Sequence, residues 1–80
     1  MTMEAMEDRV QQWWIRAPIG EVVVYHEGLL MLDRLRKKST DIKAKAFLDL
    51  AEHGVVQLFQ QRISTDRHRC RYLARKVKNP

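Results

Sequence analysis

Cysteine is almost missing from this chain, since Cys70 is the only one among its 80 residues. A single thiol excludes a disulfide within the chain, and sequences without disulfides are typical of a reducing compartment. No run of about 18 apolar residues is present, so no segment is suited to crossing a membrane as a helix. The acidic N-terminus also lacks the apolar core of a signal peptide. We therefore expect a cytoplasmic protein with no membrane partner.

The marks of catalysis are absent as well. The three glycines form no phosphate-binding loop, and the sequence has no nucleophile motif or pair of metal-binding carboxylates at a familiar spacing. His26, with Asp33 or Glu27, is the best candidate for acid–base work, but nothing in the sequence completes such a site. A domain of this size also offers little room for a closed pocket. We predict that the chain is not an enzyme and uses no cofactor or small-molecule substrate.

A metal site is not expected either. His53, His68 and Cys70 are the candidate ligands, whereas structural zinc normally takes four. Cys70 is better interpreted as a small buried apolar residue.

Positive charge, in contrast, is abundant and unevenly distributed. Residues 1–33 hold two arginines and six carboxylates, a net charge of −4. Residues 34–80 hold thirteen Lys and Arg against four carboxylates, a net charge of +9. Such asymmetry favours a surface that meets a polyanion, and the alternative is a basic surface that only keeps the protein soluble.

Hydrophobic periodicity predicts one α+β domain over residues 1–80. The predicted elements are a helix over 3–17, a strand over 21–26, helices over 29–38 and 42–53, and strands over 55–63 and 69–77. Ser39 and Thr40 are expected to separate the second and third helices, and Thr40 or Asp41 to cap the third. Gly54 suits the left-handed residue that ends a helix. Residues 64–68 form the hairpin tip, and residues 76–80 are expected to fray.

The same patterns predict which side chains share a face. Leu29, Leu32 and Leu35 lie three residues apart, on one side of the second helix. The strand residues predicted to face the helices are Val56, Leu58, Cys70, Tyr72 and Ala74. In the first helix, Trp13 or Trp14 is expected to anchor the core while its neighbour covers the rim, and the alternative is that one of them binds a partner.

The predicted order of elements resembles the winged helix-turn-helix family. The stretch from Leu50 to Val56, LAEHGVV, looks like the end of a recognition helix that leads into the first strand of the wing. The resemblance covers about residues 3–77 and implies binding of duplex DNA, with the helix near residues 41–53 in the major groove and the wing along phosphates or the minor groove.

The presumed recognition helix departs from that pattern. Lys43 and Lys45 stand at its start, but Asp49 and Glu52 follow, and the helix has no Arg, Asn or Gln with which to contact base edges. We therefore expect contacts with phosphates more than with bases. The candidate DNA-binding residues are Arg34, Arg36, Lys37, Lys38, Lys43, Lys45, Arg67, Arg69, Arg71 and Arg75.

The arginines between 67 and 75 fall on one strand face by the period of two, with Gln57 and Gln61 beside them. The alternative for these arginines is a solvated face that protects the sheet from aggregation. The leading hypothesis is a small DNA-binding protein with a regulatory or accessory role. The alternative is a winged-helix scaffold, a homodimer or an inhibitor, that binds another protein through Trp13 and Trp14. RNA binding is less favoured, because the glycine and aromatic motif of RNA-binding sheets is absent.

Overall fold

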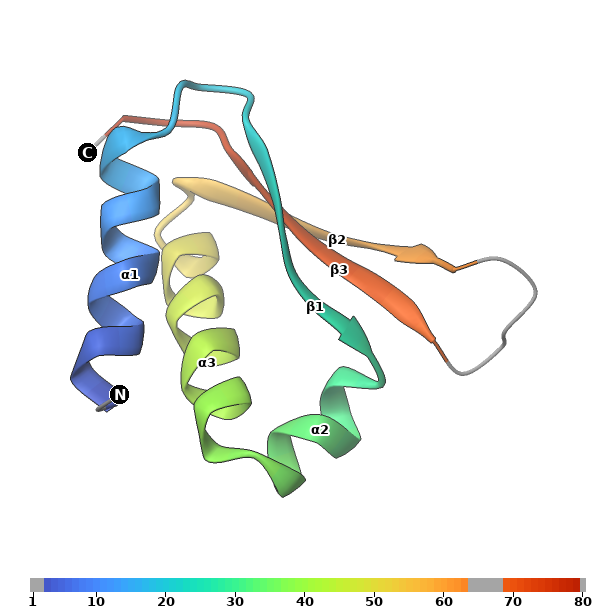
Figure 1. The fold of residues 1–80 in the computed structure, drawn as a ribbon. Coiled ribbons are helices and arrows are strands. Elements are labelled where there is room, and N and C mark those ends of the chain that lie inside the picture. The colour runs from blue at the N-terminus through green and yellow to red at the C-terminus, as the bar shows by residue number, and fades with distance from the viewer. Residues whose placement is uncertain (1–2, 64–68, 80) are drawn as a thin grey trace.

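The computed structural model describes residues 3–63 and 69–79, apart from the side chains of residues 3–7. In chain order the elements are α1 (Met3–Arg16), β1 (Val22–Gly28), α2 (Leu30–Arg36), α3 (Lys38–Glu52), β2 (Val56–Arg62) and β3 (Cys70–Lys76) (Figure 1). The α+β class and the order of elements are confirmed, and the layout is compatible with a winged-helix-like arrangement. Over the described residues, no helix is long and apolar enough to cross a membrane.

The three strands form one antiparallel sheet with the order β1-β3-β2, so β3 is the central strand. The pairing of β1 with β3 is interrupted between Val24 and His26, where Tyr25 has no partner in β3. This irregularity directs Tyr25 into the core, where only 7% of its surface is exposed. Figure 1 shows α1 and α3 side by side, with the β2–β3 hairpin running away from both helices.

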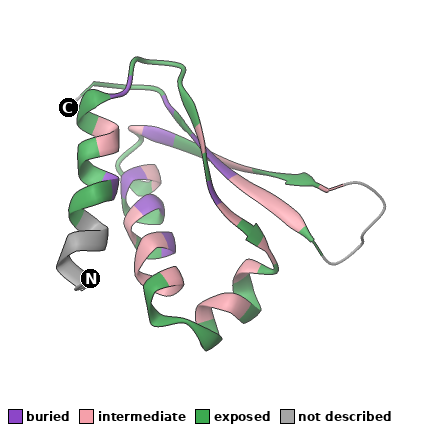
Figure 2. Cartoon of the chain, in the orientation of Figure 1, coloured by how far each residue is buried: buried purple, intermediate pink, exposed green. Residues whose placement is uncertain are grey.

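The core is built from every element except α2. Its buried members are Val10, Tyr25, Phe47, Leu50, Val56 and Ala74. The rings of Tyr25 and Phe47 stack with centroids 4.6 Å apart, which joins β1 to α3. Figure 2 shows this burial along α3 and the central parts of the strands, whereas α2 contains no buried residue.

The helix-facing side of the hairpin was predicted correctly at four of the five positions, whereas Cys70, expected to be buried, is only partly buried. Val56 and Ala74 are buried in the core, and Leu58 and Tyr72 pack against it. Gly54 has a φ of +74°, and its N–H donates to the Ala51 carbonyl oxygen at 3.0 Å, so it ends α3 as expected.

The junction between α2 and α3 differs from the prediction. Ser39 and Thr40 lie inside α3, and the two helices are separated by Lys37 alone, whose φ of −125° and ψ of 118° are extended. Lys37 occupies the N-cap position and makes no side-chain cap. Asp41 does not cap the helix because it is the fourth residue within it, and its carboxylate binds Arg34 of α2 and Lys45 of α3.

The expected fraying of the C-terminal segment is wrong for residues 76–78. Lys76 is only 1% exposed, and its Nζ donates to the Ala17 carbonyl oxygen at 2.6 Å, just beyond the end of α1. That position is the negative end of the helix dipole, where a cation is favoured. The Trp14 indole then donates to the Lys78 carbonyl oxygen at 2.9 Å. Pro80 lies outside the described residues.

Candidate nucleic-acid interface

The sheet has one face toward the helices and one face away from them. Ala74 is fully buried and pairs with Val23 and Leu58, which pack against the core, so this row marks the helix-facing side. Side chains alternate along a strand, so Arg71, Leu73 and Arg75 point to the opposite side. We call that side the outer face of the sheet.

Two arginines of β3 occupy this outer face, each in a cross-strand row. Arg71 lies between Glu27 of β1 and Gln61 of β2, and its Nε donates to Glu27 Oε1 at 3.2 Å. Arg75 pairs with Gln57, and its guanidinium carbon lies 5.5 Å from the centroid of the Phe59 ring, which is a cation–π geometry. The period of two therefore placed the arginines and glutamines together correctly.

An apolar row separates the two arginine rows. Leu73 is 7% exposed and lies between Val24 and Phe59, although it faces away from the helices. Its position in the central strand buries it, because neighbours on both sides cover it. The sequence analysis predicted only which residues face the helices and made no prediction for Leu73, because the topology alone identifies β3 as central.

The far end of the hairpin adds two exposed cations, Arg62 and Arg69. The carbonyl oxygen of Arg69 accepts from the N–H of Ile63 at 3.2 Å, which closes the described part of the hairpin. Arg67 and His68 lie outside the described residues. Arg62 was not among the predicted site residues, although its position at the end of the strand before the tip was a usable signal.

The second basic cluster lies where α2 meets α3. Arg34 is engaged internally, since its Nε donates to Asp41 Oδ1 at 2.7 Å. Arg36, Lys37 and Lys38 are exposed. Arg36 and Lys37 line an open pocket of about 520 Å³ together with Glu27, the partner of Arg71. The cluster at 34–38 and the outer face of the sheet therefore adjoin at Glu27.

Lys43 and Lys45 of α3 lie close to other side chains of the protein. Lys45 Nζ lies 3.1 Å from Asp41 Oδ2, and hydrogen bonds from Arg34 and then Lys45 hold the pKa of the Asp41 carboxyl below its usual value. Lys43 is half-buried and lines a cleft of about 240 Å³ with Phe47 and other apolar residues. From Lys45 onward, the α3 residues that face solvent are Lys45, Leu48, Asp49 and Glu52. This surface has no Arg, Asn or Gln, and its Lys45 is paired with Asp41.

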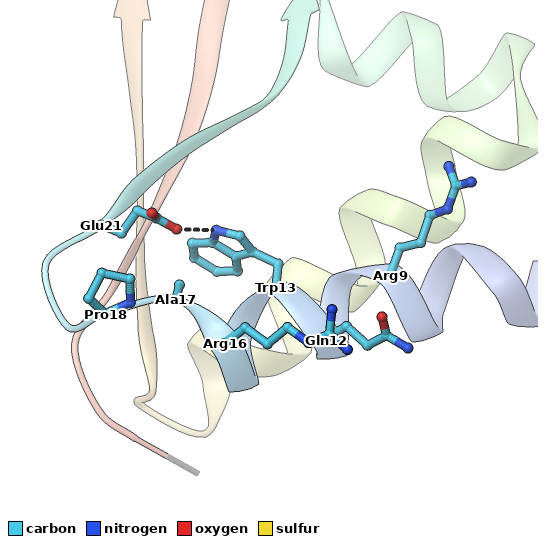
Figure 3. A pocket seen from close by; sticks show the side chains of 7 residues that line it. All are labelled: Arg9, Gln12, Trp13, Arg16, Ala17, Pro18 and Glu21. Atoms are coloured by element: carbon cyan, nitrogen blue, oxygen red, sulfur yellow. Dashed lines mark hydrogen bonds between the residues drawn. The ribbon is translucent and has the colours of Figure 1, made fainter.

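Both tryptophans are bonded within the protein. The Trp13 indole donates to Glu21 Oε2 at 3.0 Å and its ring contacts Phe47 with centroids 5.7 Å apart. Trp14 donates to Lys78, as described above. Trp13 lines a shallow pocket of about 450 Å³. Figure 3 shows the side chains that surround it, among them Arg9, Gln12 and Arg16 of α1. These contacts are sufficient to fix the positions of both indole rings within the protein. Binding of a partner by either tryptophan stays a prediction.

Histidines of the described chain serve local contacts. His26 Nε2 and Asp33 Oδ2 are 2.6 Å apart, so of the two carboxylates considered for His26 the structure selects Asp33. His53 Nδ1 donates to the Asp49 carbonyl oxygen at 2.8 Å, and this bond raises the pKa of the imidazole. Over residues 3–63 and 69–79, no three His, Cys, Asp or Glu side chains are grouped so that they can hold a metal ion.

Comparison with known proteins gives no guide to function. No protein-family model, no curated protein and no solved structure matches this chain.

Proposed function

We propose that this protein binds duplex DNA through the outer face and the far end of the β2–β3 hairpin, in a regulatory or accessory role. The observation that carries the proposal is the common face of Arg71 and Arg75, with Gln57 and Gln61 opposite them. Arginine donors suit phosphate oxygens, and glutamine amides can bind phosphates or adenine edges.

The dimensions of the hairpin support contact with a duplex. Arg71 and Arg75 are four residues apart along β3, which corresponds to roughly 13 Å. A two-stranded ribbon fits the major groove, and it can also follow one phosphate backbone. Because α3 has no Arg, Asn or Gln, we expect affinity from phosphates and little sequence preference.

A salt titration with a short duplex tests the proposal. The sequence from residue 62 to residue 75 contains five arginines, Arg62, Arg67, Arg69, Arg71 and Arg75. With about five phosphate contacts, the logarithm of the association constant should fall against the logarithm of salt concentration with a slope of about −4 to −5. Absence of binding at low salt, or a slope near zero, would contradict DNA binding.

Paired substitutions test whether the hairpin is the DNA-binding site. Arg69→Gln with Arg71→Gln should reduce the steepness of the salt slope by about 2, because each phosphate contact contributes about one. Reversal of both charges to glutamate should abolish measurable binding. The matched control is Arg9→Gln with Arg16→Gln, which removes the same charge from exposed positions on α1. Equal losses in the two pairs would show attraction by net charge alone, and the hairpin assignment would be wrong.

A substitution at Glu27 should strengthen DNA binding, which is the opposite of the effect expected for the arginine substitutions. Its carboxylate pairs with Arg71, so it competes with phosphate for the same guanidinium. Both side chains are about half exposed, so the pair is weak. Glu27→Gln should strengthen binding by roughly two- to fivefold at low salt. Weaker binding by this variant would mean that the ion pair positions Arg71 rather than competing for it.

A further inference from the structure

The orientation of α2 is opposite to that of an ordinary surface helix. Such helices bury an apolar stripe and leave their polar side in water. In α2 the polar residues Asp33 and Arg34 turn toward the protein, whereas Met31 is 82% exposed and Leu35 is 83% exposed. These are the most exposed large apolar side chains of the described chain. Of the three leucines predicted to share one side of this helix, Leu32 and Leu35 do so, but that side faces solvent, and Leu29 precedes the helix in extended conformation.

Ion pairs and a hydrogen bond hold the helix in this orientation. Asp33 binds His26 of β1 at 2.6 Å, and Arg34 binds Asp41 of α3 at 2.7 Å. The N–H of Leu30 donates to the Tyr72 hydroxyl oxygen at 3.3 Å, while the Leu30 side chain packs against the core. The apolar stripe is therefore presented on an anchored helix.

The stripe consists of Met31, Leu32 and Leu35, with Leu29 at its start. Leu32 is 45% exposed and Leu29 is 37% exposed. A contiguous exposed apolar patch of this kind is typical of a surface that another molecule covers. Exposed Arg36, Lys37 and Lys38 border its C-terminal end, so the chemistry of the patch is apolar with a basic edge.

We infer that the α2 stripe is a docking site for a short amphipathic helix of another protein, with apolar residues on one side and acidic residues beside them. The basic edge gives the charge complementarity, and the apolar side chains give the buried area. Seven residues of helix span only about 10 Å. That length is too small for a stable dimer interface of about 800 Å² per partner. Two copies would also bring together chains of net charge +5.

The test uses the full chain labelled with ¹⁵N and a synthetic peptide of about 14 residues, four helical turns long. The peptide carries leucines on one face and glutamates on the others. Its addition should shift the amide signals of residues 29–38 and leave those of β2 in place. The same peptide with lysines instead of glutamates should not bind, since the basic edge repels it. Binding of both peptides alike, or shifts confined to another region, would overturn the proposal.

Substitutions make the assignment specific. Met31→Gln with Leu35→Gln should weaken binding of the acidic peptide at least about tenfold, because two buried apolar contacts are lost. Both positions are more than 80% exposed, so the fold should persist. The matched control is Ile15→Gln with Leu48→Gln, which removes two exposed apolar side chains from α1 and α3 and should bind as the unmodified chain does.

Self-association is measured on the same samples by light scattering. A monomer at all concentrations is the expected result. A dimer that the Met31→Gln, Leu35→Gln variant abolishes would show that a second copy occupies the stripe, and the proposed acidic partner would be wrong. Duplex DNA binding should be equal for both glutamine variants, because neither changes a hairpin residue. The outcome for α2 is thereby independent of the DNA-binding proposal.

Discussion

The neighbouring helices α2 and α3 use their apolar residues in opposite ways. They are separated by Lys37 alone, yet α3 buries Ala44, Phe47 and Leu50 while α2 buries nothing. In α3 the packing against other elements holds the helix in place. In α2 specific polar contacts and the Leu30 side chain hold the helix, while Met31, Leu32 and Leu35 remain exposed to solvent. The comparison shows that an apolar stripe reveals which residues share a face, but not which way that face points.

The largest expected effect is a difference in unfolding free energy between substitutions on the apolar face of α3 and on that of α2. Phe47→Ala should destabilise the protein by about 3–5 kcal/mol, because it opens a cavity beside Tyr25 and Trp13. Leu35→Ala should change stability by no more than about 0.5 kcal/mol, since the side chain is 83% exposed. Urea unfolding of both variants measures the difference. Similar costs at the two positions would mean that α2 packs on the protein through its leucines.

Gly28 tests the backbone that places α2. Its φ is +126°, and a Cβ added there would lie 2.8 Å from Asp33 Oδ2, the atom that binds His26. Gly28→Ala should therefore cost about 1–3 kcal/mol and disturb that contact. Gly20→Ala is the control: it also has a positive φ but meets nothing within 4 Å. Unfolding gives the total cost, and the His26 ring signals should change in the Gly28 variant only.

The link between β1 and α2 predicts a local effect. Asp33→Asn should cost about 1 kcal/mol, because the pair is partly exposed and loses a charged hydrogen bond. Hydrogen exchange should show faster opening of α2 amides than in the unmodified chain, with α3 amides little affected. Uniform acceleration of exchange in both helices would contradict the separate anchoring of α2.

The smallest expected effect concerns pH. Arg34 and then Lys45 hold the pKa of Asp41 below its ordinary value, so the folded state favours the carboxylate. This stabilisation is present above the ordinary pKa, near 4, and is lost as the pH falls through the lower folded-state pKa. Asp41→Asn should lower Tm at pH 7 and flatten its decline toward pH 3. An unchanged decline in the variant would show that Asp41 does not contribute to acid sensitivity.

Much of the architecture followed from short-range patterns. The apolar spacing of α3 and Gly54 at its end predicted the helix and its termination, and the alternation within the hairpin predicted its helix-facing residues. These features depend on neighbours within a few positions, so the sequence carries them directly. The same alternation placed Arg71 and Arg75 with the two glutamines.

The errors arose where distant residues decide the outcome. The orientation of α2 depends on the pairs His26–Asp33 and Arg34–Asp41, and helical spacing is the same for either orientation. Lys76 was expected at a frayed end, but its buried Nζ donates a hydrogen bond to the Ala17 carbonyl oxygen, which is distant in sequence. The partner of Arg71, Glu27, is likewise set by the pairing of β1 with β3.

We propose that the hairpin is the DNA-binding surface and that the α2 stripe is not. Titration of the ¹⁵N-labelled full chain with a short duplex at low salt tests both parts in one measurement. We predict that amide signals of Gln57, Gln61, Arg71 and Arg75 shift with the added DNA while those of Met31 and Leu35 stay in place. Shifts centred on α2 or α3 with an unperturbed hairpin, or no shifts at all, would contradict it.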